Sequence, residues 1–487
     1  MEYKPTIGLE IHAELKTKTK MFCGCLNDSE EKKPNANVCP ICMGHPGTLP
    51  VINKEAVASV IRTGIALNCN VPDLAKFDRK NYFYPDLPKG YQISQYDKPL
   101  CEKGYLEVDG KKIVIKRIHL EEDTGKLMHS GEDFSLVDYN RAGVPLMELV
   151  TEPDIKSAQE AKKFAEELQL ILKYLGVSDA DMEKGQMRVE ANISVSKTEK
   201  LGTKVEIKNL NSFRAVEKGI EYETERQKEL LKDGGKVLQE TRGWDDVKSK
   251  TFPQREKEEA HDYRYFPEPD LPPLKHAPEL IKEIKAEIFE LPQGKRERFE
   301  KEYGLDARET GVLVGDKKMC NYFEKVISEL GDWLTSIEGS QVMNNEKFFK
   351  LAKLAANYLT SDLRGIMEGL SFEKLQITPE NFAEFITLIY KGKISSKIAK
   401  MVLIEMFKTG ADPSHIIEDQ KLDQITDVSE IEGIVREVVA ANPRVVKDYK
   451  AGKENAFQYL IGQIMAKSRG KANPQTARDV LNKALTE

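Results

Sequence analysis

The sequence has no hydrophobic run that could cross a membrane, and it carries little net charge. A helix that spans a bilayer needs about 20 apolar residues in succession, and no apolar run here approaches that length. The chain starts with Met1-Glu2-Tyr3-Lys4, which leads directly into a strand pattern and lacks the apolar segment of a signal peptide. We therefore expect a cytoplasmic protein without a membrane segment. Because the net charge is only −6, any contact with nucleic acid requires local basic patches.

Cysteine is scarce, and its number is odd. Seven cysteines do not suit a framework of disulfides, and four of them form two close pairs, Cys23/Cys25 and Cys39/Cys42. Two such pairs can supply four thiolates tetrahedrally to zinc, which leaves no open position and makes the site structural. The alternative is a set of reduced cysteines without metal. The spacing favours zinc.

The chain is too long for one ordinary core. Its 487 residues include 40% hydrophobic and 32% charged residues, which is typical of a soluble protein with several domains. Strand patterns fill the first part, and helical periodicity dominates from about Pro292. We predict a domain over residues 1–293, a helical domain over 294–411 and a helical tail over 412–487.

The stretch Thr6–Leu15 alternates strictly between apolar and polar residues. Period two is the strand period, so one face enters a core and the other presents Glu10, His12 and Glu14. Same-face neighbours lie about 6.6–6.8 Å apart, a distance at which pairs can converge on one ion or phosphate. A solvated polar face is the alternative.

The same alternation returns over residues 187–195 and 204–208, with Glu190 and Lys208 on the polar side. If these strands share a sheet, that face has too many ionisable groups to be a core. Oxygen ligands with an imidazole suit magnesium or manganese, which in turn suit nucleotide phosphates. A further strand ends in acids: the second strand of a hairpin over 105–120, with its turn at Asp109-Gly110, runs into Glu121 and Glu122, between which alternation cannot choose. Glu148 lies inside the apolar run 144–150, where a buried carboxylate needs a cation or hydrogen bonds. The candidate ligands are Glu10, His12, Glu121, Glu122, Glu148 and Glu190.

Basic and aromatic residues interleave over residues 76–92, where arginine and lysine suit phosphate and tyrosine can stack on a base. A packed aromatic corner explains the same composition equally well. Residues 241–274 contain several aromatic and charged residues and are interpreted as a long loop of the kind that forms lids or binding loops. From Gly433 onward bases outnumber acids ten to five, and Lys467, Arg469 and Lys471 form a basic turn that suits a nucleic-acid backbone.

Taken together, these motifs resemble the B subunits of bacterial tRNA-dependent aspartyl/glutamyl amidotransferases along essentially the whole chain. The resemblance is carried by residues 7–12, the cysteine pairs, and the segments 84–95, 119–123, 140–146 and 262–272. It implies an α+β fold, in which an antiparallel-sheet cradle domain similar to glutamine synthetase and guanidino kinases precedes the all-α helical and tail domains.

The resemblance also implies a reaction. ATP phosphorylates the side-chain carboxylate of glutamate on glutamine tRNA, or of aspartate on asparagine tRNA, and ammonia then displaces phosphate to form the amide. An amidase-type A subunit frees that ammonia from glutamine, and a small C subunit clasps the two. Because the anions ATP and carboxylate must meet, cations are needed, and Mg²⁺ bound by the candidate ligands above is one of them. The candidate clamps for phosphate or carboxylate are Arg79, Lys80, Arg141, Lys208 and Arg264. The candidate contacts for ATP are Lys89, Tyr82 and Tyr91.

Two other functions fit parts of the sequence. A zinc-stabilised RNA-binding module without catalysis would explain the cysteines and the basic tail. A metallohydrolase would explain the acids, and it would turn over without ATP or an ammonia source.

Overall fold

The computed structural model describes residues 2–129, 134–256, 263–338, 346–422, 425, 427–468 and 470–486. The chain divides into two compact units, Met1–Leu291 and Pro292–Glu487. This division lies two residues from the predicted boundary at 293. The further division at residue 411 stays a prediction.

The first unit is built on one large sheet of mixed α+β architecture. Its strands follow the order β13-β12-β11-β10-β1-β9-β6-β5, and all neighbours are antiparallel except β11 and β12, which are parallel. The bounds are β1 Lys4–Glu14, β5 Cys101–Val108, β6 Lys111–Glu122, β9 Pro145–Thr151, β10 Met187–Ser196, β11 Val205–Leu210, β12 Glu240–Asp245 and β13 Lys250–Glu256.

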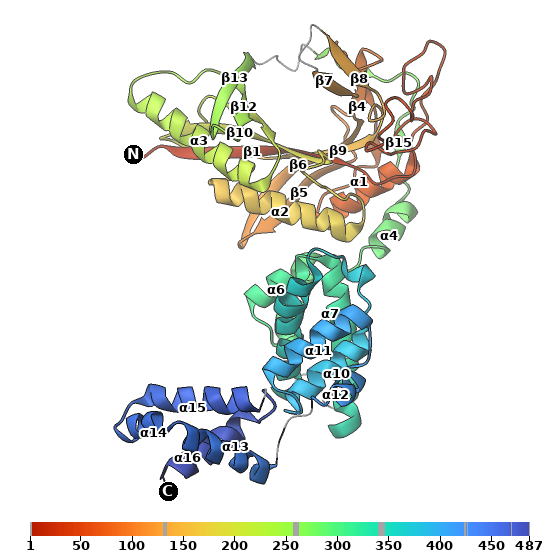
Figure 1. Cartoon of the computed structure of the whole chain (residues 1–487). Coiled ribbons are helices and arrows are strands. Elements are labelled where there is room, and N and C mark those ends of the chain that lie inside the picture. The colour runs from red at the N-terminus through yellow and green to blue at the C-terminus, as the bar shows by residue number, and fades with distance from the viewer. Residues whose placement is uncertain are drawn as a thin grey trace. The chain divides into compact units, whose positions relative to one another are not determined.

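Helices cover one face of this sheet. Ile7, Leu9 and Ile11 of β1 are at most 1% exposed, and the hydrophobic core that they enter includes residues of α1 (Lys54–Ala66), α2 (Ala158–Leu175) and α3 (Phe213–Lys232). Figure 1 shows α2 and α3 lying against this face. The side chains of Asn53, Ser157 and Ser212 accept hydrogen bonds from free backbone N–H groups in the first turns of the three helices.

The three strands with alternating polar faces are neighbours in the sheet, in the order β11-β10-β1, which confirms the prediction that they share it. The register places His12 opposite Glu148 of β9 and Arg188 of β10, and it places Glu10 opposite Glu190. The predicted hairpin is also present as β5 and β6, with a turn at Asp109-Gly110. The polar side chains of four strands therefore lie on the face that the helices leave open.

The prediction of a long loop over residues 241–274 is wrong for its first part. Residues 240–256 form β12 and β13, which extend the large sheet, because Trp244 packs against α3 and enters the core. Short pairings hold the later part: β14 (Phe266–Pro267) pairs with β3 (Asp78–Asn81), which pairs with β4 (Tyr91–Ser94), and β15 (Leu274–Lys275) pairs with β2 (Leu74–Ala75). Residues 257–262 lie outside the described part of the chain.

The remaining elements of the first unit are the hairpin of β7 (Lys126–His129) and β8 (Ser135–Asp138), and helix α4 (Pro278–Ala286).

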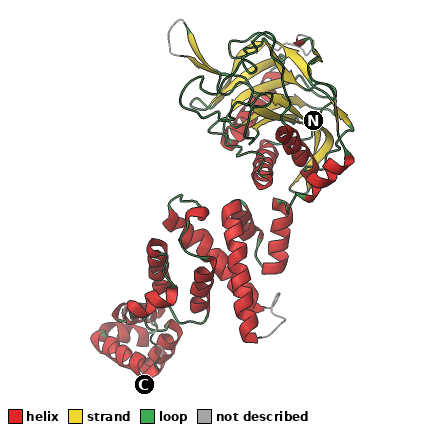
Figure 2. Ribbon diagram, turned by 90° about the vertical axis from the view of Figure 1, so that its right-hand side faces the viewer, coloured by secondary structure: helices red, strands yellow, loops and turns green. Residues whose placement is uncertain are grey.

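The second unit is helical, as Figure 2 shows. Its elements are α5 Pro292–Tyr303, α6 Ala307–Val314, α7 Lys317–Glu338, α8 Glu346–Asn357, a π-helical turn Tyr358–Leu363, α9 Arg364–Met367, a 3-10 turn Phe372–Lys374, α10 Pro379–Tyr390, α11 Ser396–Thr409, α12 Pro413–Asp419, α13 Val428–Ala441, α14 Pro443–Lys450, α15 Glu454–Lys467 and α16 Pro474–Thr486. Helices α13, α15 and α16 enclose a hydrophobic cluster of their own around Val435 and Leu460. No helix of the described residues is long and apolar enough to cross a membrane.

The central position of β1 makes its apolar face a sensitive test of this fold. We expect Ile11→Ala to lower the free energy of unfolding by about 2–4 kcal/mol, because Ile11 is 1% exposed and its removal leaves a cavity. Val114→Ala on β6 is the matched control, since Val114 is 39% exposed and should change stability by less than about 0.5 kcal/mol. Urea denaturation followed by circular dichroism measures both, and equal losses would contradict the arrangement.

Candidate active site

A buried carboxylate between two imidazoles forms the centre of the open face of the sheet. Glu148 Oε2 lies 3.3 Å from His12 Nε2 and 3.2 Å from His119 Nε2, because β9 runs between β1 and β6 with these residues in register. Glu121 joins them, with Oε1 3.8 Å from His12 Nε2 and Oε2 3.7 Å from His119 Nε2. Glu148 is 5% exposed, and His119 and Glu121 are each 2% exposed.

Mutual charge sets the protonation of this centre. Burial alone would lower the pKa of His12, but its hydrogen bond to Glu148 and the charges of Glu148 and Glu121 outweigh burial and raise the pKa to about 9. Burial would likewise raise the pKa of Glu148, yet the two imidazoles hold it well below its ordinary value. The acids therefore need positive charge, which protons on histidine supply here and a bound cation can supply instead.

The acidic groups continue along the sheet as one row. Ligand atoms lie within 4.8 Å of one another in three overlapping groups, namely His119/Glu121/Glu148, Glu10/His12/Glu148 and Glu10/Glu190/Glu206. We call these seven residues the acidic row. Burial, together with the charges of Glu148 and Glu190, raises the pKa of Glu10 to about 7.

The donor set of the acidic row fits divalent cations. Carboxylate oxygens with an imidazole are ligands that Mg²⁺ and Mn²⁺ accept. Three buried polar atoms on this face, His12 Nδ1, Glu121 Oε2 and Asn192 Oδ1, have no hydrogen-bond partner among the described residues. Native structures leave few buried polar atoms unpaired, and a place for an ion or a water is an ordinary reason for one.

A cleft of about 760 Å³ opens beside the acidic row, and Lys80, Tyr82, Lys208 and Tyr263 line part of it. Lys208 Nζ lies 2.6 Å from Glu190 Oε2. Lys80 Nζ lies 5.1 Å above the ring of Tyr263, and the charges of Glu121 and Glu148 raise the pKa of Lys80 against the opposing effect of burial. Two of the predicted clamps and one predicted nucleotide contact thus share one cleft, which has the size of a small-molecule site.

The other end of the open face carries a second charged group. Arg188 binds Asp123 with both terminal nitrogens, at 3.1 and 3.2 Å, and Arg141 Nε lies 3.7 Å from the same carboxylate. Arg141 also donates to the carbonyl oxygens of Thr124 and Gly125 at 3.1 and 2.7 Å. The guanidinium of Arg141 therefore stabilises the turn at Thr124 and Gly125.

Several residues predicted for the site lie outside the acidic row. Glu122 points to the other side of β6, where it pairs with Lys89 and accepts the backbone N–H of Ile93 at 2.9 Å. Successive side chains of a strand lie on opposite faces, so Glu121 is on the open face and Glu122 is not. The neutralised Glu122 is not among the groups that could hold a cation in the described part of the chain.

Arg79 is likewise engaged. It binds Glu268 with Nε and Nη2 at 2.7 and 2.9 Å, and its guanidinium lies 4.2 Å above the ring of Tyr91. Arg264 is exposed and has φ +42°. Arg79, Tyr91 and Lys89 therefore lie outside the acidic row. Arg79 contacts Glu268 and the ring of Tyr91, and Lys89 pairs with Glu122.

Sequence reasoning did not nominate Glu206, His119, Asp123 or Arg188 for the site. A signal existed for three of them: His119, Arg188 and Glu206 each lie two residues before a nominated residue, so each shares a face with it. The nominated residues are Glu121, Glu190 and Lys208. The contact between Arg188 and Asp123 joins residues 65 positions apart, and no local pattern shows it.

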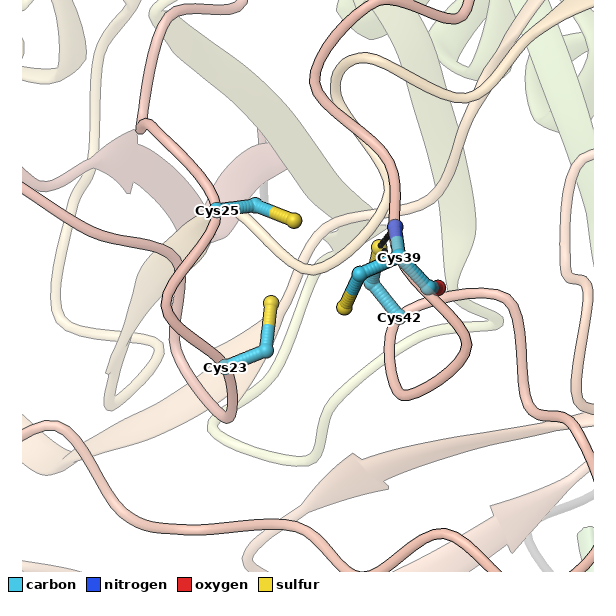
Figure 3. Close-up of side chains that lie close together, drawn as sticks. All are labelled: Cys23, Cys25, Cys39 and Cys42. Carbon is cyan, nitrogen blue, oxygen red and sulfur yellow. Dashed lines mark hydrogen bonds between the residues drawn. The ribbon is translucent and has the colours of Figure 1, made fainter.

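The four paired cysteines converge on one point. Their sulfur atoms all lie within 4.8 Å of one another, and Figure 3 shows them facing a common centre. Tetrahedral zinc with Zn–S bonds of about 2.3 Å places the sulfurs about 3.8 Å apart, so the cluster fits the ion. The backbone N–H of Cys39 donates to Cys42 Sγ at 3.2 Å, and a hydrogen bond with Cys23 lowers the pKa of the Cys42 thiol to about 5.

Two of the three basic residues predicted to bind tRNA are described. Lys467, at the end of α15, pairs with Glu437, and Lys471 Nζ donates to the carbonyl oxygen of Lys421. Arg469 lies outside the described residues. The role of all three stays a prediction.

The raised pKa of Glu10 predicts that cation binding depends on pH. Below its pKa of about 7 Glu10 holds a proton that a cation must displace, so affinity for Mg²⁺ or Mn²⁺ falls as the pH falls. From about pH 8 to about pH 6 the proton of Glu10 alone weakens binding roughly tenfold, and the proton of His12, whose pKa is about 9, adds to this fall. Calorimetric titration measures the change, and Glu107→Gln, at an exposed position of β5, is the control that should keep it. An affinity that is constant over this range would contradict the assignment of Glu10.

Comparison with known proteins assigns the chain to a family. A family model described as the GatB/GatE catalytic domain matches residues 5–282, and one described as the GatB domain matches residues 342–485. Three similar proteins, from Caldanaerobacter subterraneus subsp. tengcongensis, Persephonella marina and Thermotoga maritima, are 48%, 49% and 47% identical to the chain. Each alignment covers 100% of this chain and 99–100% of the relative. All three relatives are named as the B subunit of aspartyl/glutamyl-tRNA(Asn/Gln) amidotransferase, and the chain belongs to this family of B subunits.

Proposed function

We propose that this chain carries the amide-forming site of a glutamine-dependent, carbon–nitrogen-bond-forming amidotransferase that acts on misacylated tRNA. The names of its full-length relatives support the reaction class. The observation that carries the proposal in the structure is the acidic row, a set of buried and half-buried carboxylates beside a cleft of nucleotide size.

The chemistry explains why such a row is needed. A carboxylate is a poor acceptor for ammonia, because its oxygen leaves badly. Transfer of the γ-phosphoryl group of ATP to the side-chain carboxylate of glutamyl-tRNA(Gln) or aspartyl-tRNA(Asn) forms an acyl phosphate and releases ADP. Ammonia then attacks the acyl carbon, phosphate leaves, and the amide is formed. Bringing an anionic carboxylate to ATP requires fixed positive charge.

The residues of the row divide this task. Glu148, Glu121 and the two histidines would hold one Mg²⁺, and Glu10, Glu190 and Glu206 would hold another. Bound Mg²⁺ neutralises phosphate oxygens and stabilises the charge that develops during transfer. Lys80 and Lys208 face the same cleft with ammonium groups that can bind phosphate, while Tyr82 and Tyr263 offer aromatic faces.

Other residues act by support. Arg79 and Lys89 are paired with Glu268 and Glu122, so they hold strands together beside the cleft. Arg141 supports the turn next to Asp123, and Arg264 stays a candidate clamp for phosphate or carboxylate. The four cysteines would hold a structural zinc ion, which their convergence supports.

The proposed assembly follows the family resemblance. An amidase-type A subunit supplies ammonia from glutamine, and a small C subunit joins the two chains. The cradle formed by the large sheet is similar to glutamine synthetase and guanidino kinases, which also transfer phosphoryl groups. A purely RNA-binding module would have no use for the acidic row. A metallohydrolase would act without ATP.

The catalytic role of the acidic row is tested in the complex with its partner subunits, misacylated tRNA, ATP and glutamine. We expect Glu10→Ala and His12→Ala each to reduce amide formation by on the order of 100-fold or more, because each removes a ligand of the transferring phosphate's cation. The fold and tRNA affinity should persist, since both side chains lie on the open face of the sheet.

Glu107→Ala is the matched control, because Glu107 is an exposed acid of β5 in the same sheet and should leave the rate unchanged. Full activity of both site variants would remove the acidic row from the mechanism. Turnover of the substrate without ATP or an ammonia source would point to the hydrolase.

The basic tail predicts a salt-dependent contact with tRNA. We expect the double variant Lys467→Gln/Lys471→Gln to weaken tRNA binding and to lower the slope of log affinity against log salt by about 1–2, since each lost phosphate contact removes close to one released counterion. Lys325→Gln/Lys374→Gln changes the charge equally at exposed positions elsewhere in the second unit and serves as the control. Filter binding at several salt concentrations measures the slope. An unchanged slope in the tail variant would give the tail another role.

A further inference from the structure

Lys20 is a fully buried lysine without a carboxylate partner among the described residues. Its side chain is 0% exposed, and it is among the largest side chains of the chain with no access to solvent. Within the part of the chain that the structure describes, no aspartate or glutamate lies within ion-pair distance of its ammonium group. Lysine is almost never fully buried unless it is paired, because removing a charge from water is costly.

The hydrogen bonds of Lys20 indicate which group can supply the negative charge that its ammonium group needs. Its Nζ donates to the carbonyl oxygens of Asn37 and Tyr139 at 2.7 and 3.2 Å, and to the sulfur of Cys42 at 3.9 Å. These contacts use all three protons of the ammonium group. Both carbonyls are neutral, so the sulfur is the one acceptor of the three that can carry negative charge.

The charge of the proposed metal site matches this arrangement. Four thiolates around Zn²⁺ carry a net charge of −2, and a buried site of that charge needs a cation nearby. We propose that Lys20 is the counter-ion of the cysteine cluster and couples the metal-bound state of the cluster to the turn that carries Arg141. This inference rests on the zinc site proposed above.

The coupling runs through the loop between the two cysteine pairs. The backbone N–H of Asn37 donates to Oδ1 of Asn140, which is fully buried, and the amide of Asn140 donates to the carbonyl of Lys33, both at 2.8 Å. Lys20 adds its bond to Tyr139 on the same turn.

Two more bonds complete this connection. The backbone N–H of Tyr139 donates to Asn35 Oδ1 at 2.8 Å, and that of Met21 donates to the carbonyl of Gly143 at 2.7 Å. Both ends of the turn 139–143 are therefore tied to the cysteine loop or to the segment beside Lys20. Within the turn, Arg141 reaches Asp123 at the end of the open face of the sheet. Lys20 is thus a positioning residue, which holds the cluster and the turn in one arrangement.

The test compares Lys20→Met with Lys18→Met in the 487-residue chain. Methionine keeps much of the apolar stem of Lys20 and removes its charge, whereas Lys18 is exposed and serves as the matched control. Zinc affinity is measured by competition with a chromophoric chelator. Loss of a hydrogen bond to a ligand weakens metal binding by about 10–100-fold, so we expect this loss in Lys20→Met and none in Lys18→Met.

Cobalt substitution supplies a readout that a merely structural lysine would not move. The unaltered chain should give the visible bands of tetrahedral cobalt with one ion bound. In Lys20→Met the tetrahedral bands should persist, while the sulfur-to-metal charge-transfer band moves to longer wavelength, because the sulfur has lost a donor and a positive charge. An unchanged band with unchanged zinc affinity would overturn the inference. Absence of tetrahedral cobalt in the unaltered chain would instead overturn the zinc site.

A second measurement needs no variant and covers the case in which Lys20→Met fails to fold. The unaltered chain is treated with an amine-acetylating reagent with zinc bound and after its removal by chelation, and modified lysines are mapped by mass spectrometry. Lys20 should be protected with zinc and become reactive without it, and hydrogen exchange of the amides in residues 139–143 should increase in the same way. Equal protection of Lys20 in both states would contradict its role as counter-ion.

Discussion

The open face of the large sheet depends on the cost of gathering carboxylates where they are largely shielded from water. Glu148 and Glu121 are almost fully buried, and Glu10, Glu190 and Glu206 continue from them along the same sheet. Such a row is tolerable only when positive charge compensates it. Histidine protons and lysines do so in part here, and Mg²⁺ with its phosphate ligands is the proposed occupant during the reaction. The concentrated negative charge that makes the row costly without cations also makes it suited to bind the Mg²⁺ that phosphoryl transfer needs.

The fold meets this requirement by separating two tasks on one sheet. One face of β1 enters a core with helices α1–α3, and this packing fixes the position of the strand. The other face is then free to carry charged side chains whose spacing is set by strand register. Neighbouring strands bring His12, Glu148 and His119 into one line, although they come from three separate segments of the sequence. The smaller strand pairs and the cysteine cluster lie outside this sheet.

The sequence was sufficient for those parts of the site that local periodicity controls. Alternation over residues 6–15 and 187–195 correctly placed Glu10 and His12 on one face, with Glu190 on the neighbouring strand. Alternation could not choose between Glu121 and Glu122, because an acidic turn can shift the register, and it could not show that Lys89 neutralises Glu122. Arg79 resembled a phosphate clamp because its partner, Glu268, is distant in the sequence. Strands β12 and β13 were missed because charged and glycine residues hide their alternation.

Cation binding to the acidic row is the central claim, and the position of the ion tests it most directly. The measurement is a crystal structure of the chain with its partner subunits, a non-hydrolysable ATP analogue and Mn²⁺, with manganese located by its anomalous scattering. The account predicts one manganese ion beside Glu148 and Glu121 and another beside Glu10 and Glu190, with phosphate oxygens of the analogue completing their coordination. Nucleotide bound in the cleft with no manganese on the acidic row would contradict it.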